Sequence, residues 1–173
     1  MDHADHVRLL RDGVTPGGTW ADLGAGTGAF TRALAELVGP EGEVIAVDRD
    51  RGALRELERR IRPGGAAVRT FVADFTTPLD VPPLDGIVMA NSLHFVKDKT
   101  PVLALVTAML KPSGRLVLVE YETDKGNQWV PYPMSFETWR ALADRSGFSA
   151  TRKLHRVGSG FLGGFFSAES VKA

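Results

Sequence analysis

Residues 22–28 read Asp-Leu-Gly-Ala-Gly-Thr-Gly, with glycine at every second position from Gly24 to Gly28. The glycines follow a short strand predicted at residues 20–23, and from Phe30 to Val38 the apolar residues recur at helical spacing. Its glycines let the backbone turn tightly and approach a ligand with no side chain between them, while the next helix presents free amide groups at its start. The stretch therefore predicts a strand, a ligand-binding glycine loop and a helix.

On both sides of this stretch, strands and helices alternate. Apolar runs predict further strands at residues 44–47, 67–72, 86–90 and 115–121. Helices are expected at residues 2–11, through Leu54 and Leu57, along Val102 to Leu110, and from a Ser135 cap to about Ser146. Three prolines within residues 76–83 predict a loop there, because proline removes a helical hydrogen bond.

The C-terminal part predicts an antiparallel hairpin, with strands at about residues 150–156 and 161–168 joined by Gly158-Ser159-Gly160. Alternating units followed by a hairpin predict an α/β fold with an open, mostly parallel seven-stranded sheet and helices on both faces. The chain has 173 residues, of which 43% are hydrophobic, so we expect residues 1–173 to form a single domain.

Composition narrows the range of functions. Lys plus Arg and Asp plus Glu number 21 each, and no basic cluster occurs, which argues against a nucleic-acid substrate. The acidic start of the chain and the lack of an apolar run of ~18 residues predict no signal peptide, no membrane helix and a cytoplasmic location. Because the chain contains no cysteine, disulfides, thiolate metal sites and cysteine nucleophiles are excluded.

In open α/β sheets, ligands bind beyond the carboxyl ends of the strands, where the strand order reverses. The glycine loop alone leaves two ligands open, because Gly24, Gly26 and Ala29, with Asp48 downstream, also fit the dinucleotide fingerprint of an NAD(P)-dependent reductase. Asp22 favours the other ligand, since a carboxylate there would repel a pyrophosphate and attract a cation. S-adenosylmethionine carries such a cationic end.

Residues 22–28 resemble the glycine motif of class I S-adenosylmethionine-dependent methyltransferases. The resemblance continues through residues 73–75, similar to the family's adenine-site motif, residues 90–94 after the fourth strand, and residues 110–115 leading into the fifth. It covers most of the chain. The resemblance implies a Rossmann-like methyltransferase fold, S-adenosylmethionine as cofactor and S-adenosylhomocysteine as product.

The same resemblance assigns roles to the polar residues at the strand ends. Asp48 is expected to accept hydrogen bonds from both ribose hydroxyls, and Asp74 to accept one from the adenine amine. The expected cofactor-binding residues are Asp22, Gly24, Ala25, Gly26, Asp48, Arg49, Asp74, Phe75 and Asn91. The alternatives are a strand-end cap for Asp22, a helix cap for Asp48 and a turn residue for Asp74.

Methyl transfer from a sulfonium is an in-line displacement that needs positioning and, for a protonated acceptor, a base. His94 and Tyr121 are the candidate catalytic residues, although His94 also fits a packing role. The aromatic and polar residues 122–134 form either a wall that folds over the acceptor or an ordinary loop. Phe161, Phe165 and Phe166 are expected in the sheet core.

The histidines predict no metal site. His3 and His6 are expected on an exposed helix face, and His155 is expected to face solvent. We therefore predict an enzyme without a metal ion.

The acceptor is narrowed by what the sequence lacks. Residues 91–94, Asn-Ser-Leu-His, differ from the Asn/Asp-Pro-Pro-aromatic motif of enzymes that methylate exocyclic or amide nitrogens, and methylation that depends on cysteine is excluded. The prediction is methyl transfer to an oxygen, nitrogen or carbon of a small molecule. The alternatives are a non-catalytic S-adenosylmethionine-binding partner subunit and an NAD(P)-dependent reductase; a homo-oligomer or a partner that completes an open site is also left open.

Overall fold

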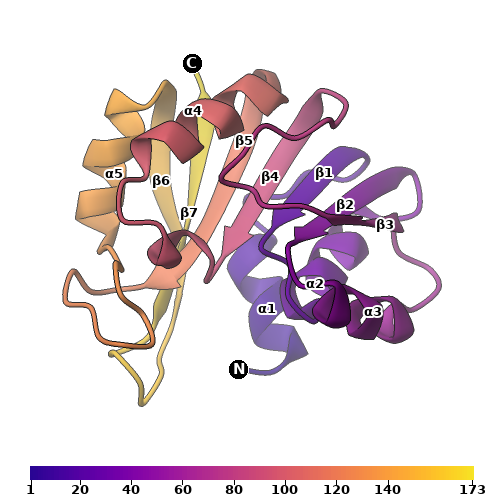
Figure 1. The fold of residues 1–173 in the computed structure, drawn as a ribbon, viewed down its shortest axis with the longest axis horizontal. Helices are drawn as coiled ribbons and strands as arrows, with labels where there is room; N and C mark the ends of the chain where they lie inside the picture. The colour runs from indigo at the N-terminus through magenta and orange to yellow at the C-terminus, as the bar shows by residue number, and fades with distance from the viewer.

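The computed structural model describes residues 1–173 and contains one sheet flanked by helices (Figure 1). The first six elements in chain order are α1 (His3–Leu10), β1 (Gly18–Leu23), α2 (Ala29–Val38), β2 (Gly42–Asp48), α3 (Arg51–Arg60) and β3 (Ala67–Val72). The remaining elements are β4 (Leu84–Ala90), the 3-10 turn η1 (Leu93–Phe95), α4 (Thr100–Met109), β5 (Leu110–Tyr121), α5 (Phe136–Arg145), β6 (Phe148–Val157) and β7 (Phe165–Lys172).

Side-chain caps fix where several helices begin. Asp2 and Asp5 form a reciprocal capping box at α1. The Asp50 carboxylate accepts from the first amides of α3, and the Ser135 hydroxyl accepts from Thr138 N at α5, as the sequence predicts for that cap. Proline occupies the first turn of α4, where no amide donor is required.

The strand order in the sheet is β3-β2-β1-β4-β5-β7-β6. Strands β1 to β5 pair in parallel, and β7 inserts antiparallel between β5 and β6. The order reverses between β1 and β4, so the carboxyl ends of these two strands border the crevice where such sheets bind ligands. The seven-stranded sheet with a C-terminal antiparallel hairpin confirms the predicted fold class.

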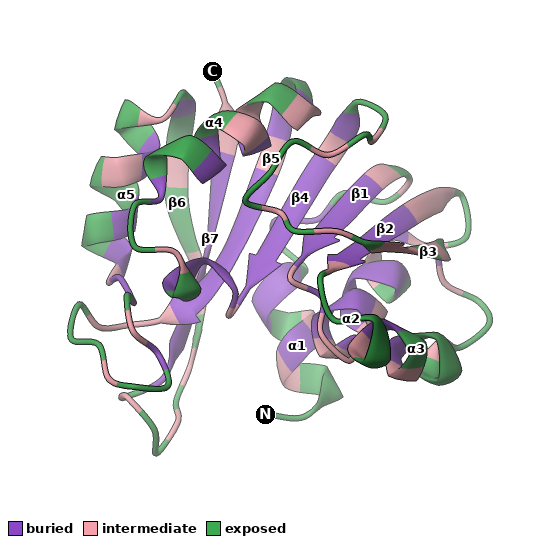
Figure 2. Ribbon diagram, in the orientation of Figure 1, coloured by how far each residue is buried: buried purple, intermediate pink, exposed green.

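Successive side chains along each strand point to opposite faces of the sheet, so two hydrophobic cores form, one on each face. Ala21 and Leu23 of β1 face α4 and α5, and Trp20 faces α1 and α2. Helix α3 packs separately, through Leu54 and Leu57, on the β2 side. Figure 2 shows the central strands buried and the outward surfaces of the helices exposed. Helices therefore cover both faces, as predicted.

Three sequence-based expectations differ from the structure. Strand β5 begins at Leu110, five residues before its predicted start at residue 115. The hairpin turn is longer than predicted, because β7 begins at Phe165 and residues 158–164 lie between the strands. Phe165 and Phe166 are buried as expected, but Phe161 lies in this turn and is 42% exposed. The alternating pattern alone predicted that the last strand begins at about residue 161. In the structure, glycines 163 and 164, both at positive φ, interrupt the extended backbone before β7.

Gly86 of β4 pairs with Trp20 of β1 and leaves room for its indole ring, because a Cβ at this position would lie 2.2 Å from the ring. Gly86→Ala should therefore overpack the sheet and lower the free energy of unfolding by about 1–3 kcal/mol, or roughly 2–12 °C in Tm. Thermal melts measure the effect. Gly158→Ala, at a position with no neighbour within 4 Å, is the matched control; equal melting of both variants would contradict this packing constraint.

Candidate active site

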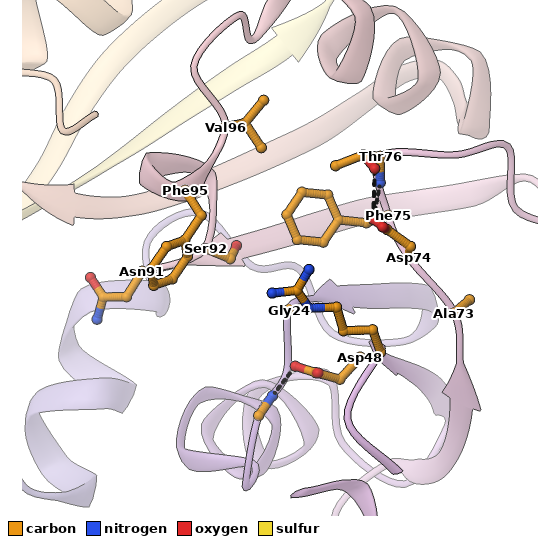
Figure 3. Close-up of a pocket in the computed structure, with 12 residues that line it drawn as sticks. Gly24, Asp48, Ala73, Asp74, Phe75, Thr76, Asn91, Ser92, Phe95 and Val96 are labelled. Atoms are coloured by element: carbon orange, nitrogen blue, oxygen red, sulfur yellow. Dashed lines mark hydrogen bonds between the residues drawn. The ribbon is translucent and has the colours of Figure 1, made fainter. Parts of the chain in front are cut away.

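The carboxyl ends of β1 to β4 surround a cavity of about 640 Å³ (Figure 3). Its lining residues come from the loops that follow successive strands: Gly24, Gly26, Asp48, Arg49, Ala73, Asp74, Phe75, Thr76, Asn91, Ser92, Phe95 and Val96. This is the position expected from the strand order. The cavity therefore joins motifs that lie up to seventy residues apart in the sequence.

The glycine loop forms one wall of this cavity. Gly24 N and Ala25 N donate to Val47 O at 2.8 and 3.0 Å, which fixes the loop against the end of β2. Gly24 has φ 85°, and a Cβ there would lie 2.5 Å from Ser92 Cβ, so only glycine fits. A Cβ at Gly26 would meet nothing within 4 Å. The loop thus presents bare backbone to a ligand.

Asp48 lies at the end of β2 and joins the glycine loop to α3. Its Oδ2 accepts from Gly26 N and its Oδ1 accepts from Asp50 N, both at 2.8 Å. Figure 3 shows this carboxylate at the border of the cavity. Each oxygen retains a further lone pair, so the carboxylate is able to accept two hydroxyl donors as well.

Asp74 and Phe75 form the side of the cavity that follows β3. Asp74 Oδ1 accepts from Thr76 N at 2.9 Å and from Thr76 Oγ1 at 2.7 Å. These hydrogen bonds lower the pKa of Asp74, which keeps the group an ionised acceptor. The Phe75 ring extends towards the cavity in Figure 3 and gives it an apolar surface.

Asp22 is buried at the end of β1, on the side of the sheet that faces α2. Its Oδ2 accepts from Thr31 Oγ1 at 2.6 Å. Burial raises the pKa of Asp22 to about 6, the Thr31 hydrogen bond opposes the shift, and Asp48 adds to it. Asp22 lines a smaller cavity of about 230 Å³, which shares Gly24 and Asn91 with the large one. A cation bound there would favour the ionised carboxylate.

His94 is buried in η1 and is held by Glu120, the fully buried residue one position before the end of β5. Glu120 Oε2 lies 2.8 Å from His94 Nδ1, and Oε1 accepts from His94 N at 3.1 Å. With the Glu120 oxygen as acceptor, Nδ1 is the donor and Nε2 is the ring nitrogen with a free lone pair. Nε2 has no partner within the protein and is not fully covered.

Tyr121 supports His94 rather than replacing it. Their ring centroids are 5.9 Å apart. Burial, together with Glu120, raises the pKa of Tyr121, so its phenol stays protonated near neutral pH. Of the two predicted catalytic residues, His94 is the one whose side chain is held by a buried carboxylate.

Residues 122–134 are fastened to the segment after β4. Tyr132 N donates to His94 O at 3.0 Å, and the buried Lys99 ammonium donates to Val96 O and Tyr132 O, each at 2.9 Å. None of these loop residues lines either cavity, and Trp129 is 68% exposed. The loop therefore supports the backbone around His94 without covering the large cavity.

The structure brings all nine predicted cofactor-binding residues to the two cavities. Seven line the large cavity, and Asp22 and Ala25 line the small one together with Gly24 and Asn91. Sequence reasoning marked residues 90–94 without assigning a role to Ser92, and it missed Phe95 and Glu120. A buried acid at the end of an apolar strand was the signal available for Glu120.

Two histidines differ from their expected exposure. His6 is buried against Phe30, with ring centroids 4.6 Å apart, because α1 packs its face on α2. His155 is partly buried and its Nε2 contacts Asp12 Oδ2 at 2.7 Å. No three His, Asp or Glu side chains gather closely enough to hold a metal ion. None of the helices is both long and apolar enough to cross a membrane.

Comparison with known proteins agrees with this geometry. A family model described as a methyltransferase domain matches residues 21–114. The ubiquinone/menaquinone biosynthesis C-methyltransferase UbiE of Bordetella parapertussis is 35% identical over 112 residues, which are 64% of this chain and 43% of that protein. The chain thus spans less than half the length of this relative.

Solved structures share the fold. A methyltransferase from Aquifex aeolicus, dependent on S-adenosylmethionine, matches with TM-score 0.75 and 21% identity over 98% of this chain and 90% of that one. The N-methyltransferase NodS from Bradyrhizobium japonicum, in complex with S-adenosyl-l-homocysteine, matches with TM-score 0.74 and 20% identity over 98% and 85%. At these identities the likeness concerns the fold.

The strand order and the cavity at the glycine loop define the class I, S-adenosylmethionine-dependent methyltransferases. Because the family model covers more than half of the sequence, this chain belongs to the methyltransferase domain family. Neither a reductase nor a non-catalytic partner subunit is favoured by these matches.

The buried Asp22 carboxylate is expected to lower the stability of the ligand-free protein and to raise its affinity for the cofactor. Its pKa is raised to about 6 from 3.8, so the native state holds the proton more tightly and stability falls as pH rises between these values. Asp22→Asn should therefore raise the free energy of unfolding of the ligand-free protein by about 1–3 kcal/mol at pH 7 and by much less near pH 4.

Thermal melts at the two pH values measure this difference, and titration with S-adenosylhomocysteine should show weaker binding by the same variant. An equal effect at both pH values would mean that the Asp22 charge does not cause it.

Asp48 should be required for cofactor affinity. Asp48→Ala removes the carboxylate that holds Gly26 N and faces the cavity, so the affinity for S-adenosylhomocysteine should fall by about 1–3 kcal/mol, roughly 5- to 150-fold. Isothermal titration calorimetry measures it. Asp80→Ala, at an exposed position away from both cavities, is the control. Unchanged affinity in Asp48→Ala would remove Asp48 from the site.

Proposed function

We propose that this enzyme binds S-adenosylmethionine across the two cavities and transfers its methyl group to an acidic oxygen, nitrogen or carbon of a small planar molecule. The buried pair of His94 and Glu120, next in the chain to Phe95 of the large cavity's lining, carries the proposal. A positioned base is required only for an acceptor that must lose a proton. The acceptor is therefore of the phenol, enol or protonated-amine kind.

The residues present fit the cofactor. A Cβ at Gly24 would close the space between the glycine loop and Ser92, and Asn91 Oδ1 is buried without a hydrogen-bond partner. Asp48 would accept from the ribose hydroxyls, with Arg49 beside it, and Asp74 and Phe75 would hold the adenine. When bound, the cofactor supplies an electrophilic methyl group on a sulfonium. Asp22 would attract the cationic end.

The chain's own contribution to the chemistry is orientation and proton removal. The acceptor's nucleophilic atom would be held in line with the methyl group that the bound cofactor supplies, and the acceptor's proton would pass to His94 Nε2. Glu120 holds the imidazole in the tautomer that leaves this nitrogen free, through bonds to both Nδ1 and the main-chain amide. Glu120 is therefore a positioning residue.

A row of aromatic rings suits a planar acceptor. Phe95 lines the large cavity, and its ring centroid lies 4.3 Å from that of His94. Tyr121 continues the row, with centroids 5.9 Å from His94 and 5.5 Å from Phe161. Stacked or edge-on contacts of this kind bind flat conjugated molecules. The name of the UbiE relatives, which places their activity in ubiquinone and menaquinone biosynthesis, supports this class of acceptor.

Thermal melts with S-adenosylhomocysteine, S-adenosylmethionine and NAD test the cofactor first. A ligand at ~100 times its Kd stabilises the protein by about 2.7 kcal/mol, so the adenosyl ligands should raise Tm by roughly 5–10 °C and NAD should not. A shift with NAD alone would overturn the proposal.

His94→Gln then tests the base. Turnover with a panel of phenols, enols and amines should fall by about 10²- to 10⁴-fold, while affinity for S-adenosylhomocysteine stays nearly constant, because His94 contacts neither cavity. His155→Gln, a partly buried histidine on β6, is the control. If His94→Gln weakened cofactor binding as much as turnover, His94 would be structural.

A further inference from the structure

The small cavity of about 230 Å³ is closed on one side by α1, an element that the sequence motifs do not involve. Its walls come from the end of β1, the glycine loop, the start of α2 and the end of β4, with Met1 and His6 completing them. Gly24 and Asn91 line both cavities, so the small cavity adjoins the large one at the carboxyl ends of the neighbouring strands β1 and β4. In Figure 3 the Asn91 amide points away from Phe75.

Unpaired polar groups gather on this small cavity. Five buried side-chain atoms in the protein lack a hydrogen-bond partner, and two of them, Asn91 Oδ1 and His6 Nδ1, belong to its lining. Asp22 adds a buried carboxylate whose only hydrogen bond comes from Thr31. Buried polar groups are nearly always paired in folded proteins. Two unpaired atoms and a carboxylate with a single hydrogen bond on one cavity therefore indicate a polar, zwitterionic ligand.

His6 has no packing reason to be polar. Its ring lies against Phe30 at 4.6 Å between centroids and is buried, so a phenyl ring would fill the same place. Burial lowers the pKa of His6, and the nearby positive charges of His3, the N-terminal amine and Arg32 act in the same direction, against Asp5. A neutral imidazole has one N–H donor and one acceptor nitrogen.

We propose that His6 binds the amino-acid end of S-adenosylmethionine in the small cavity, an inference that rests on the proposed function. The α-ammonium group pairs with Asp22 and Asn91 Oδ1, and the α-carboxylate accepts an N–H from His6. Helix α1 is thereby part of the cofactor site. The capping box at Asp2 and Asp5 fixes the start of the helix.

Two ligands separate this role from general packing. S-adenosylhomocysteine carries the amino-acid end, and 5′-methylthioadenosine has the same adenosine and thioether without it. His6→Phe keeps a ring against Phe30 and removes the donor. The variant should bind S-adenosylhomocysteine about 10- to 100-fold more weakly by calorimetry, as expected for a lost bond to a charged group, and bind 5′-methylthioadenosine as the wild type does.

His3→Phe is the matched control, because His3 is exposed on the same helix and lines neither of these two cavities. It should leave both affinities unchanged. If His6→Phe does not fold, as judged by its thermal melt, His6→Gln is tested with the same two ligands and should lose less affinity for S-adenosylhomocysteine than ten-fold, since its amide restores a donor.

The outcomes are distinguishable. If the wild type bound S-adenosylhomocysteine and His6→Phe bound it equally well, the role of His6 would be wrong while the proposed function stood. Equal weakening of both ligands in His6→Phe would also overturn the role, because it would mark His6 as a packing residue. If the wild type bound neither ligand, the proposed function itself would fall.

Discussion

The Asp22 carboxylate ends the central strand with a single hydrogen bond, from Thr31, in surroundings that raise its pKa to about 6. A charge in this position is unfavourable for folding unless something cationic approaches it. The neighbouring groups are arranged accordingly. The glycine loop leaves space beside the carboxylate, and Asn91 brings a second acceptor from the adjacent strand. Stability and ligand binding therefore oppose each other at the centre of the fold.

Around Asp22, the two halves of the sheet present different kinds of side chain at their carboxyl ends. The ends of β1, β2 and β3 present acids and glycine backbone, the groups to which we assign the adenosyl ligand. The ends of β4 and β5 present a histidine, a buried glutamate and aromatic rings, groups suited to an acceptor and its proton. The reversal of strand order between β1 and β4 places the two sets side by side. In-line transfer needs this adjacency.

Sequence reasoning succeeded where information was local. The glycine loop, the acids near the carboxyl ends of strands β2 and β3, and the proline-marked loop at residues 76–83 are each defined by a few neighbouring residues, so their positions were predicted. Contacts between residues that lie far apart in the sequence were not predicted. Glu120 meets His94 across 26 positions, and nothing in the pattern of β5 states which loop it faces. His6 was expected at the surface, because helical periodicity cannot say that α1 packs on α2.

Lys99 has a consequence for how such an enzyme changes its specificity. Its ammonium fastens the segment after β4 to the loop after β5 through two main-chain carbonyls, and Tyr132 adds a bond to His94. The two loops are therefore one exchangeable module. A loop 122–134 transplanted from another enzyme would have to bring its own residues 94–99, whereas point changes at Phe95 or Phe161 would alter the acceptor side and leave the module joined.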